Sequence, residues 1–250
     1  MNPRSYDLIV FDWDGTLMDS AAHIVQCFER AFADAGVPGP GERAIRQIIG
    51  LGLSEAIAVL APNVDSAART RVRERYSAHF IALDVEATSL FPGVRDGLER
   101  LAAHGYLLAV ATGKSRRGLD RVLAHTGLGD LFVATRCADE AFSKPHPRML
   151  EDILDRTGVP AARAIMIGDT TYDLIMARSA GVEALAVSYG VHERDELLAH
   201  DPIACCDSYQ PVVTRTRKCT HGWNAHGNPL SQQRARRRGR RPALYGASRG

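Results

Sequence analysis

The chain has 250 residues, of which 45% are hydrophobic and 24% are charged. This composition predicts a globular protein with enough apolar side chains for a sizeable core. No apolar run approaches the length needed to cross a bilayer, and the first residues have the features of neither a signal peptide nor an anchor. We therefore expect a cytoplasmic protein with no membrane partner. The five cysteines are odd in number and contain no C-x-x-C motif, which favours reduced thiols over a disulfide framework.

The net charge of +2 averages two unlike parts of the chain. Residues 211–250 hold ten Lys or Arg and no acidic residue, which leaves 21 basic against 29 acidic residues, a net charge of −8, in residues 1–210. An acidic body argues against nucleic-acid binding by the main fold. The basic tail has no hydrophobic periodicity, so we expect it to be disordered and to be the only part suited to non-specific nucleic-acid binding.

The first predicted strand covers residues 6–12, a short apolar run that ends in Asp12 and is followed by Gly15. Such a run is typical of a buried parallel strand with a polar residue at its carboxyl end. The chain then changes character, because residues 20–86 contain no convincing strand. Their helical patterns fall near residues 20–35, 42–49, 53–60 and 65–83.

We interpret residues 20–86 as a helical cap inserted directly after the first strand, where a lid can close over a substrate. A packed helical subdomain without such motion is the alternative. Asp19 and Ser20 are expected to cap the first helix of this insert. The predicted domains are a core of residues 1–19 and 87–210, the cap of residues 20–86, and the basic tail of residues 211–250.

After the insert, predicted strands and helices alternate. The strands cover residues 106–111, 164–167 and 183–187, with weaker candidates at 131–135 and 203–206. The helices cover residues 94–104, 115–126, 147–157, 171–180 and 193–199. This alternation predicts an α/β fold with a Rossmann-like, mostly parallel sheet, in which functional residues collect at the carboxyl ends of the strands.

Two pairs of acidic residues follow predicted strands. Asp12 and Asp14 lie two residues apart in an extended segment, so their carboxylates face the same way. Close carboxylates push their pKa values apart; an ionised one is a possible nucleophile toward phosphorus and a protonated one a possible proton donor. Asp169 and Asp173 lie one helical turn apart and can point at one ion, such as Mg²⁺ with its preference for oxygen ligands. A metal-free acidic turn and a helix cap at Asp169 are the alternatives.

Two further groups suit a phosphate. Thr112 and Gly113 stand at a strand end ahead of a helix, where a hydroxyl and backbone N–H groups match phosphate oxygens. Lys144, in a loop with Pro145, is a point charge that can offset the negative charge of a nucleophile and a phosphate together. Either group alone is ordinary, since a strand-end threonine or a loop lysine is usually structural or solvated.

All of these residues fall at one predicted rim of the sheet, in an order that resembles the haloacid dehalogenase-like hydrolase superfamily. The four matching motifs are Asp12-Trp13-Asp14-Gly15-Thr16-Leu17, Thr112-Gly113, Lys144-Pro145, and Gly168-Asp169 with Asp173. The resemblance covers about residues 5–207. A helical cap between the first and second motifs is the arrangement of the phosphoglycolate phosphatase and β-phosphoglucomutase branch.

The resemblance implies a phosphoric monoester hydrolase of the phosphoglycolate phosphatase type, with Mg²⁺ as cofactor and a small phosphorylated metabolite as substrate. Asp12 would be nucleophile and magnesium ligand, forming an aspartyl-phosphate intermediate. Asp14 would be general acid and then general base, with its backbone carbonyl on the metal.

The remaining motif residues take supporting roles in the same resemblance. Thr112, Gly113 and Lys144 would hold the phosphate, and Lys144 would also orient the nucleophile. Asp169 would bind magnesium, with Asp173 as a direct or indirect partner of the metal.

Three alternatives remain open from the sequence. A sugar phosphomutase of the same fold is the nearest, and nucleic-acid binding through the arginine-rich tail is a rival of another class; a dehalogenase is disfavoured because Asp14 is present. Family members end with a strand and a closing helix, whereas here residues 203–206 lead into the basic tail, so we hypothesise that a reading-frame change replaced that helix. The exact substrate and the choice between monomer and dimer stay undetermined.

Overall fold

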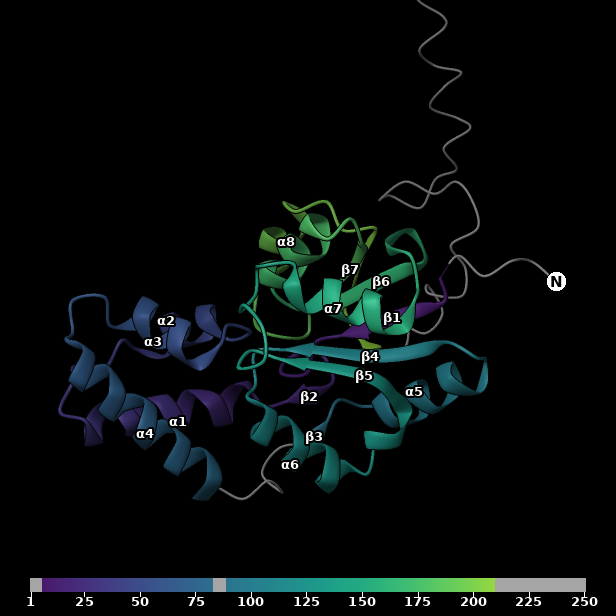
Figure 1. The fold of residues 1–250 in the computed structure, drawn as a ribbon. Coiled ribbons are helices and arrows are strands. Elements are labelled where there is room, and N and C mark those ends of the chain that lie inside the picture. Colours follow the sequence, from purple (N-terminus) through teal and green to yellow (C-terminus); the bar gives the residue numbers. More distant parts are fainter. Residues whose placement is uncertain (1–5, 83–88, 210–250) are drawn as a thin grey trace, which may run out of the picture. The chain divides into compact units, whose positions relative to one another are not determined.

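The structure, a computed structural model, describes residues 6–82 and 89–209. Its centre is a parallel sheet of six strands in the order β5-β4-β1-β6-β7-β8 (Figure 1). The strands are β1 (Leu8–Phe11), β4 (Leu107–Thr112), β5 (Phe132–Cys137), β6 (Ala164–Gly168), β7 (Glu183–Val187) and β8 (Ala204–Cys206). The predicted α/β fold is confirmed, and both weak strand candidates are strands.

Alternate side chains of the central strand face two different layers of helices. Ile9 and Phe11 pack with residues of α5 (Val94–Ala103) and α6 (Arg116–Thr126). Leu8 and Val10 pack with residues of α7 (Arg148–Thr157) and α8 (Thr171–Ser179). Because β1 is buried on both faces, its sequence is a continuous apolar run without alternation. A short helix, α9 (Arg194–Leu198), packs against β7 and β8.

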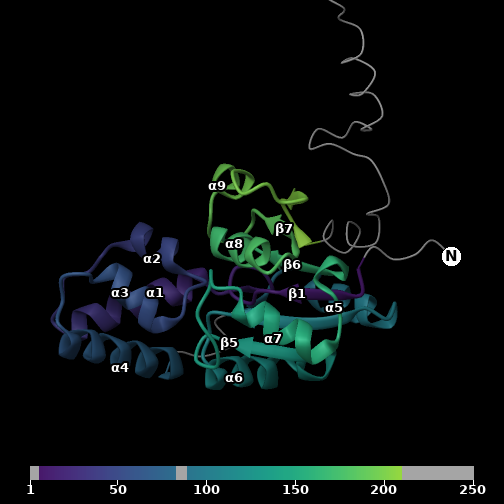
Figure 2. The same ribbon diagram turned by 45° about the horizontal axis from the view of Figure 1, so that its top comes forward.

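The inserted segment forms a helical unit with its own apolar cluster. Its helices are α1 (Ala21–Asp34), α2 (Glu42–Ile48), α3 (Leu53–Leu60) and α4 (Ser66–Ala82). They lie within the four stretches whose periodicity predicts them. Phe32, Ile45, Ile57 and Val72 are fully or almost fully buried in this cluster, which is separate from the two clusters that flank the sheet. Figures 1 and 2 both place these helices beyond the carboxyl ends of the strands.

A two-stranded antiparallel ribbon marks the place where the chain leaves the core. It pairs β2 (Met18–Asp19) with β3 (Ser89–Leu90). The sequence does not predict this ribbon, because strands of two residues are too short for a periodic pattern. The ribbon joins the two chain segments that flank the helical insert.

The C-terminal expectations fall largely on residues that the structure does not describe. The edge strand β8 is present, and Tyr209 beyond it has only 2% of its surface exposed. The basic tail and the hypothesis about a replaced closing helix lie outside the described residues. Within residues 6–82 and 89–209, no helix is both long enough and apolar enough to span a membrane.

The separate apolar cluster of the cap predicts how much stability is lost when one of its side chains is shortened. Phe32→Ala removes a ring with no exposed surface, so we expect the free energy of unfolding to fall by about 3–5 kcal/mol. Urea unfolding followed by circular dichroism measures the loss. The matched control is Val59→Ala on α3, a side chain that is 59% exposed, which should change stability by less than about 0.5 kcal/mol. Equal effects of the two substitutions would contradict a packed cap core.

Candidate active site

The strand register brings the acidic and hydroxyl residues of the motifs to one edge of the sheet. Phe11 of β1 is paired with Val110 of β4 on one side and with Ile167 of β6 on the other. Asp12 follows Phe11 directly, so it lies between the ends of β4 and β6. Neighbouring parallel strands that end together form the crevice in which such sheets bind ligands.

Three carboxylates and one ammonium group meet at this edge. Asp12, Asp169 and Asp173 are buried, and one oxygen from each lies within 4.8 Å of the others. The Nζ of Lys144 lies 2.7 Å from Oδ1 of Asp12 and 2.7 Å from Oδ1 of Asp173. One lysine faces three acids, so a full set of ionised carboxylates leaves uncompensated negative charge in a desolvated site.

The excess negative charge appears in the pKa values of the cluster. Burial raises the pKa of Asp12 well above its ordinary value; Lys144 opposes this rise, and the two neighbouring aspartates add to it. Burial, reinforced by Asp173, raises the pKa of Asp169 to about 7. Burial alone would lower the pKa of Lys144, but Asp12 and Asp173 outweigh it and raise the pKa, so the ammonium stays charged.

Asp169 is held from two loops. The hydroxyl of Thr16 donates to Oδ1 at 2.7 Å, and the backbone N–H of Val191 donates to Oδ2 at 2.9 Å. A Cβ added to Gly15 or Gly190 would lie 2.1 or 2.2 Å from Oδ2. Both loops therefore approach the carboxylate so closely that only glycine fits, and Gly15 also has φ +80°.

The helix that follows Asp169 is capped by another residue. Thr170 is the N-cap of α8, and it forms a reciprocal capping box with Asp173. The Oδ2 of Asp173 accepts from the backbone N–H of Thr170 at 3.1 Å and from its hydroxyl at 2.7 Å. The alternative interpretation of Asp169 as a helix cap is therefore wrong, and Asp173 presents only Oδ1 to Lys144 and the acidic cluster.

The donor set fits a hard divalent cation. Among the described residues, no donor forms a hydrogen bond with the buried Oδ2 of Asp12. A buried ionised oxygen without a partner is costly, and a cation bound there would remove the cost. Oxygen atoms of Asp12 and Asp169 are ligands of the kind Mg²⁺ prefers.

The polar contacts of Asp14 lie outside this cluster, with Lys114 after β4 and Ser20 before α1. The Oδ1 of Asp14 lies 2.9 Å from the Nζ of Lys114 and accepts a hydrogen bond from Ser20 at 2.5 Å. Ser20 does occupy the N-cap of α1, but its hydroxyl makes no capping hydrogen bond. The expectation that Ser20 serves as a helix cap is therefore wrong. Lys114 is a site residue that the sequence analysis did not name. Its only sequence signal is its position directly after Thr112-Gly113.

The strand end with Thr112 and Gly113 is covered by the cap. Thr112 has no exposed surface, and its hydroxyl accepts from the backbone N–H of Lys114 at 3.2 Å. A Cβ on Gly113 would lie 2.6 Å from the carbonyl oxygens of both Gly50 and Leu51, which belong to the loop after α2. Any side chain at position 113 would push this cap loop away from the core.

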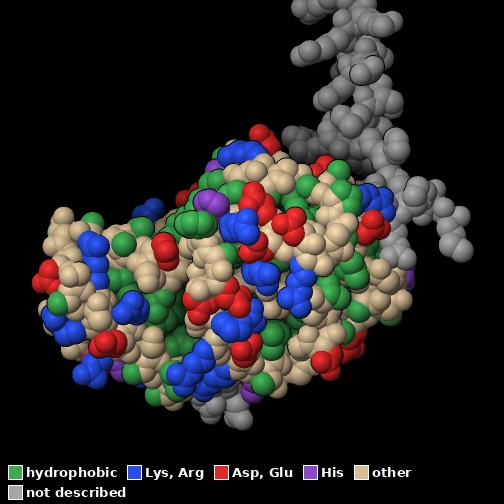
Figure 3. Space-filling model, viewed as in Figure 1, with side chains coloured by type: hydrophobic (Ala, Val, Ile, Leu, Met, Phe, Trp, Pro, Cys, Tyr) green, Lys and Arg blue, Asp and Glu red, His purple; other side chains and the backbone are tan. Residues whose placement is uncertain are grey.

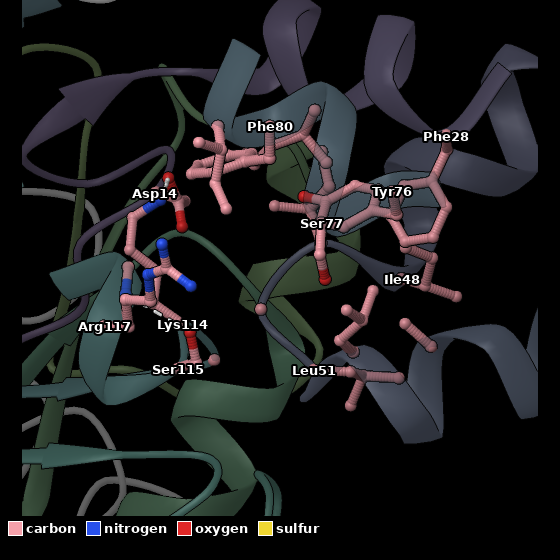
Figure 4. A pocket seen from close by; sticks show the side chains of 18 of the residues that line it. Asp14, Phe28, Ile48, Leu51, Tyr76, Ser77, Phe80, Lys114, Ser115 and Arg117 are labelled. Atoms are coloured by element: carbon pink, nitrogen blue, oxygen red, sulfur yellow. Dashed lines mark hydrogen bonds and ion pairs between the residues drawn. The ribbon is translucent and has the colours of Figure 1, made fainter. Parts of the chain in front are cut away.

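A cavity of about 510 Å³ lies beside Asp14 and Lys114, between the core loop 113–118 and the cap. Figure 3 shows a hollow lined by hydrophobic side chains where cap and core meet. Figure 4 shows Asp14 and Lys114 at one end of this cavity, close to Phe80 of the cap, with Tyr76 and Phe28 farther along it. The structure thus places Asp12, Lys144, Asp169 and Asp173 in a buried cluster, and places Asp14 at the entrance to a cavity under the cap.

Comparison with known proteins defines the class. The model of the haloacid dehalogenase-like hydrolase family matches residues 9–187. The chain belongs to this family, and it is therefore an enzyme of the hydrolase class. The predicted resemblance is confirmed.

Individual relatives narrow the class to one branch. A protein of Dickeya dadantii with the name "Probable phosphatase IndB" is 40% identical over 210 residues, covering 82% of this chain and 91% of its own. A phosphoglycolate phosphatase of Vibrio vulnificus is 27% identical, covering 85% of this chain and 97% of its own. A solved haloacid dehalogenase-like hydrolase of Streptococcus pneumoniae is 27% identical, with a TM-score of 0.75 over 84% of this chain and 98% of its own.

The buried acidic cluster predicts that Mg²⁺ stabilises the folded protein without any substrate. A ligand at about 100 times its Kd adds about 2.7 kcal/mol, so the melting temperature should rise clearly with millimolar Mg²⁺. Asp169→Asn should remove most of this rise. Asp96→Asn, which changes an exposed acid on α5, is the matched control and should keep it.

The raised pKa of Asp169 gives the pH dependence of the same measurement. Its folded pKa of about 7 lies above the ordinary 3.8, so its contribution to the stability of the metal-free protein is complete at low pH and is lost as the pH rises toward 7. Protons compete with the cation for this carboxylate. The rise in melting temperature with Mg²⁺ should therefore be larger at about pH 8 than at about pH 6; the opposite order would contradict a metal held by Asp169.

Proposed function

We propose that the chain is a magnesium-dependent phosphatase that hydrolyses the phosphate monoester of a small metabolite through a phosphoryl group carried by Asp12. The observation that carries this proposal is the set of contacts made by the two oxygens of the Asp12 carboxylate. Oδ1 is paired with Lys144, and the buried Oδ2 accepts no hydrogen bond from the described residues. The phosphatase names of the Dickeya and Vibrio relatives support the same reaction class.

In the first step, an oxygen of Asp12 attacks phosphorus, and the bond between phosphorus and the ester oxygen breaks. Lys144 orients the Asp12 carboxylate and favours its ionised form, because the charged ammonium is 2.7 Å from Oδ1; it only partly offsets the rise in pKa caused by burial, and a bound cation would favour the ionised form further. Asp14 supplies the proton that the leaving oxygen needs. The contacts of Asp14 with Lys114 and Ser20 are made by Oδ1, so we assign the proton transfer to Oδ2.

In the second step, water attacks the phosphoryl group on Asp12. Asp14, now ionised, takes a proton from this water, and the bond between phosphorus and the Asp12 oxygen breaks. The products are inorganic phosphate and the original carboxylate, with Asp14 protonated again. One residue thus acts as acid and then as base, as the reversal of proton flow between the two steps requires.

Positioning and charge compensation do most of the work in phosphoryl transfer. Thr112 and the backbone of Gly113 stand at the neighbouring strand end, next to Asp12, and suit the phosphate oxygens. A Mg²⁺ ion held by Asp12, Asp169 and the Asp14 carbonyl would neutralise charge on the phosphoryl oxygens when bound. Asp173 contributes by pairing with Lys144 at 2.7 Å.

A sugar phosphomutase would share the first step but return the phosphoryl group to a sugar instead of water. The relative with 40% identity is named a phosphatase, and this favours hydrolysis. Nucleic-acid binding through residues 211–250 gains no support from the described residues.

The nucleophile assignment predicts that Asp12→Asn abolishes turnover of phosphate esters. An amide nitrogen or oxygen in this place is a poor nucleophile, so kcat with excess Mg²⁺ should fall at least about 10⁴-fold, while circular dichroism stays that of the parent. Phosphate release from the purified protein measures the effect. Asp19→Asn, an exposed acid on β2, is the control. Measurable steady-state turnover by pure Asp12→Asn would refute the assignment.

The two roles of Asp14 predict a trapped intermediate. With an aryl phosphate, whose leaving group needs little protonation, Asp14→Asn should still transfer the phosphoryl group to Asp12. Hydrolysis should slow by about 10²–10⁴-fold, the usual contribution of general acid–base catalysis. Acid quenching followed by intact mass spectrometry should then detect a chain that carries one phosphoryl group. Fast turnover without accumulation would show that another residue activates the water.

A further inference from the structure

The cavity beside Asp14 has walls of two kinds. One wall is aromatic and comes from Phe28 on α1 and from Tyr76 and Phe80 on α4. The opposite wall is aliphatic and includes Ile48 and Leu51 at the end of α2 and in the loop after it. Figure 4 shows these labelled side chains facing one another across the cavity. A cavity of about 510 Å³ falls within the range of about 300–1,000 Å³ that holds drug-sized organic ligands.

The aromatic wall is continuous. The ring centroids of Phe28 and Tyr76 are 4.4 Å apart, and those of Tyr76 and Phe80 are 5.8 Å apart in a stacked arrangement. Rings of a ligand gain from edge and offset contacts with such a surface, beyond the gain from burying apolar area. At the end near the catalytic residues, the Nζ of Lys114 lies 4.7 Å from the centroid of Phe80, so the wall begins directly beside Asp14.

Three positively charged side chains lie at the edge of the cavity, and two of them already have partners within the protein. Lys114 is paired with Asp14, and Arg121 donates to the carbonyl oxygens of Phe80 and Ile81 at 3.3 and 2.9 Å. Arg117 is exposed and has no hydrogen-bond or ion-pair partner within the described part of the chain. Figure 4 shows Arg117 beside Lys114 at the edge of the cavity. It is the cation that remains for a ligand, and guanidinium groups suit carboxylate oxygens.

We propose that the alcohol released by this phosphatase is an aromatic one that carries a carboxylate, with the ring against Phe28, Tyr76 and Phe80 and the carboxylate toward Arg117. This inference rests on the proposed function, since it assigns the leaving group of the same reaction. A two-carbon alcohol such as glycolate would reach Asp14 but would leave both apolar walls facing water. Apolar contact distinguishes ligands by about 10–200-fold for each methylene, so the cavity should select strongly for a larger ring.

The test compares esters whose leaving oxygens are all bonded to a CH₂ group, so that the chemistry of the bond is matched. The substrates are 4-carboxybenzyl, benzyl, cyclohexylmethyl and ethyl phosphate together with phosphoglycolate, with the full-length chain and excess Mg²⁺. We expect kcat/KM for 4-carboxybenzyl phosphate to exceed that for phosphoglycolate by at least about 10-fold, and benzyl to exceed cyclohexylmethyl and ethyl phosphate.

The outcomes separate the two claims. If the enzyme turns over the esters but prefers phosphoglycolate or ethyl phosphate, the proposed aromatic leaving group is wrong and the proposed phosphatase function still holds. A preference for cyclohexylmethyl over benzyl phosphate would overturn the aromatic assignment. Absence of turnover with every ester would refute the proposed function, and with it the assignment of a leaving group.

Two variants test which side chains produce the preference for an aromatic, carboxylated leaving group. Tyr76→Ala should lower the ratio of kcat/KM for benzyl to ethyl phosphate about 10-fold, and Arg117→Gln should lower the ratio for 4-carboxybenzyl to benzyl phosphate about 10-fold. Ratios measured on one preparation cancel any loss of folded enzyme. The controls are Val59→Ala and Arg43→Gln, both exposed cap residues outside the cavity. Unchanged ratios in Tyr76→Ala and Arg117→Gln would overturn the inference.

Discussion

The contact on which the site depends is the buried ammonium of Lys144 between the carboxylates of Asp12 and Asp173. Burial works against every charge in this group, yet the two carboxylates raise the pKa of Lys144 enough to keep it charged. Removing one member would leave the others as unpaired buried charges, which is far more costly than losing a surface ion pair. Because Asp169 adds a third acid, the lysine cannot balance the cluster alone. The same imbalance that makes the metal-free site costly suits it to a divalent cation, whose charge would also offset that of a phosphoryl group.

Close approach of backbone segments is the second constraint, and it follows from the first. Two loops must come close to Asp169, and the space at Gly15 and Gly190 is already filled by its carboxylate. At Gly168, an added Cβ would lie 2.3 Å from Cγ of Asp173. Glycine at these places lets the carboxylates converge within one short edge of the sheet. A larger residue at any of these three places would collide with a carboxylate of the cluster.

Sequence patterns predicted the sheet, the helices and the confluence of Asp12, Asp169 and Asp173 for a simple reason. Buried parallel strands are continuous apolar runs, and the residue after each run lies at the same edge. The contacts of Lys114 and Ser20 with Asp14 have no such local signature, since they depend on how the first turn of α1 lies against the loop after β4. A serine before a helix favours a cap by local geometry, but the hydroxyl of Ser20 donates to Asp14 instead and makes no capping hydrogen bond. The cavity could not be predicted either, because its walls come from helices that are distant in sequence.

The division between core and cap explains how one chemistry can serve different alcohols. The charged cluster lies in the core, while most of the cavity wall belongs to cap helices that have their own apolar cluster. Changes on that wall alter the leaving group that fits and leave Asp12 and Lys144 as they are. The two parts are nevertheless coupled, because the cap loop at Gly50 and Leu51 packs directly on Gly113, and Tyr172 of the core donates to the carbonyl oxygen of Gln47 at 2.8 Å. The wall lies beside Asp14 because the cap packs on the core through these contacts, so the proposed leaving group would bind both parts at once and favour their packed arrangement.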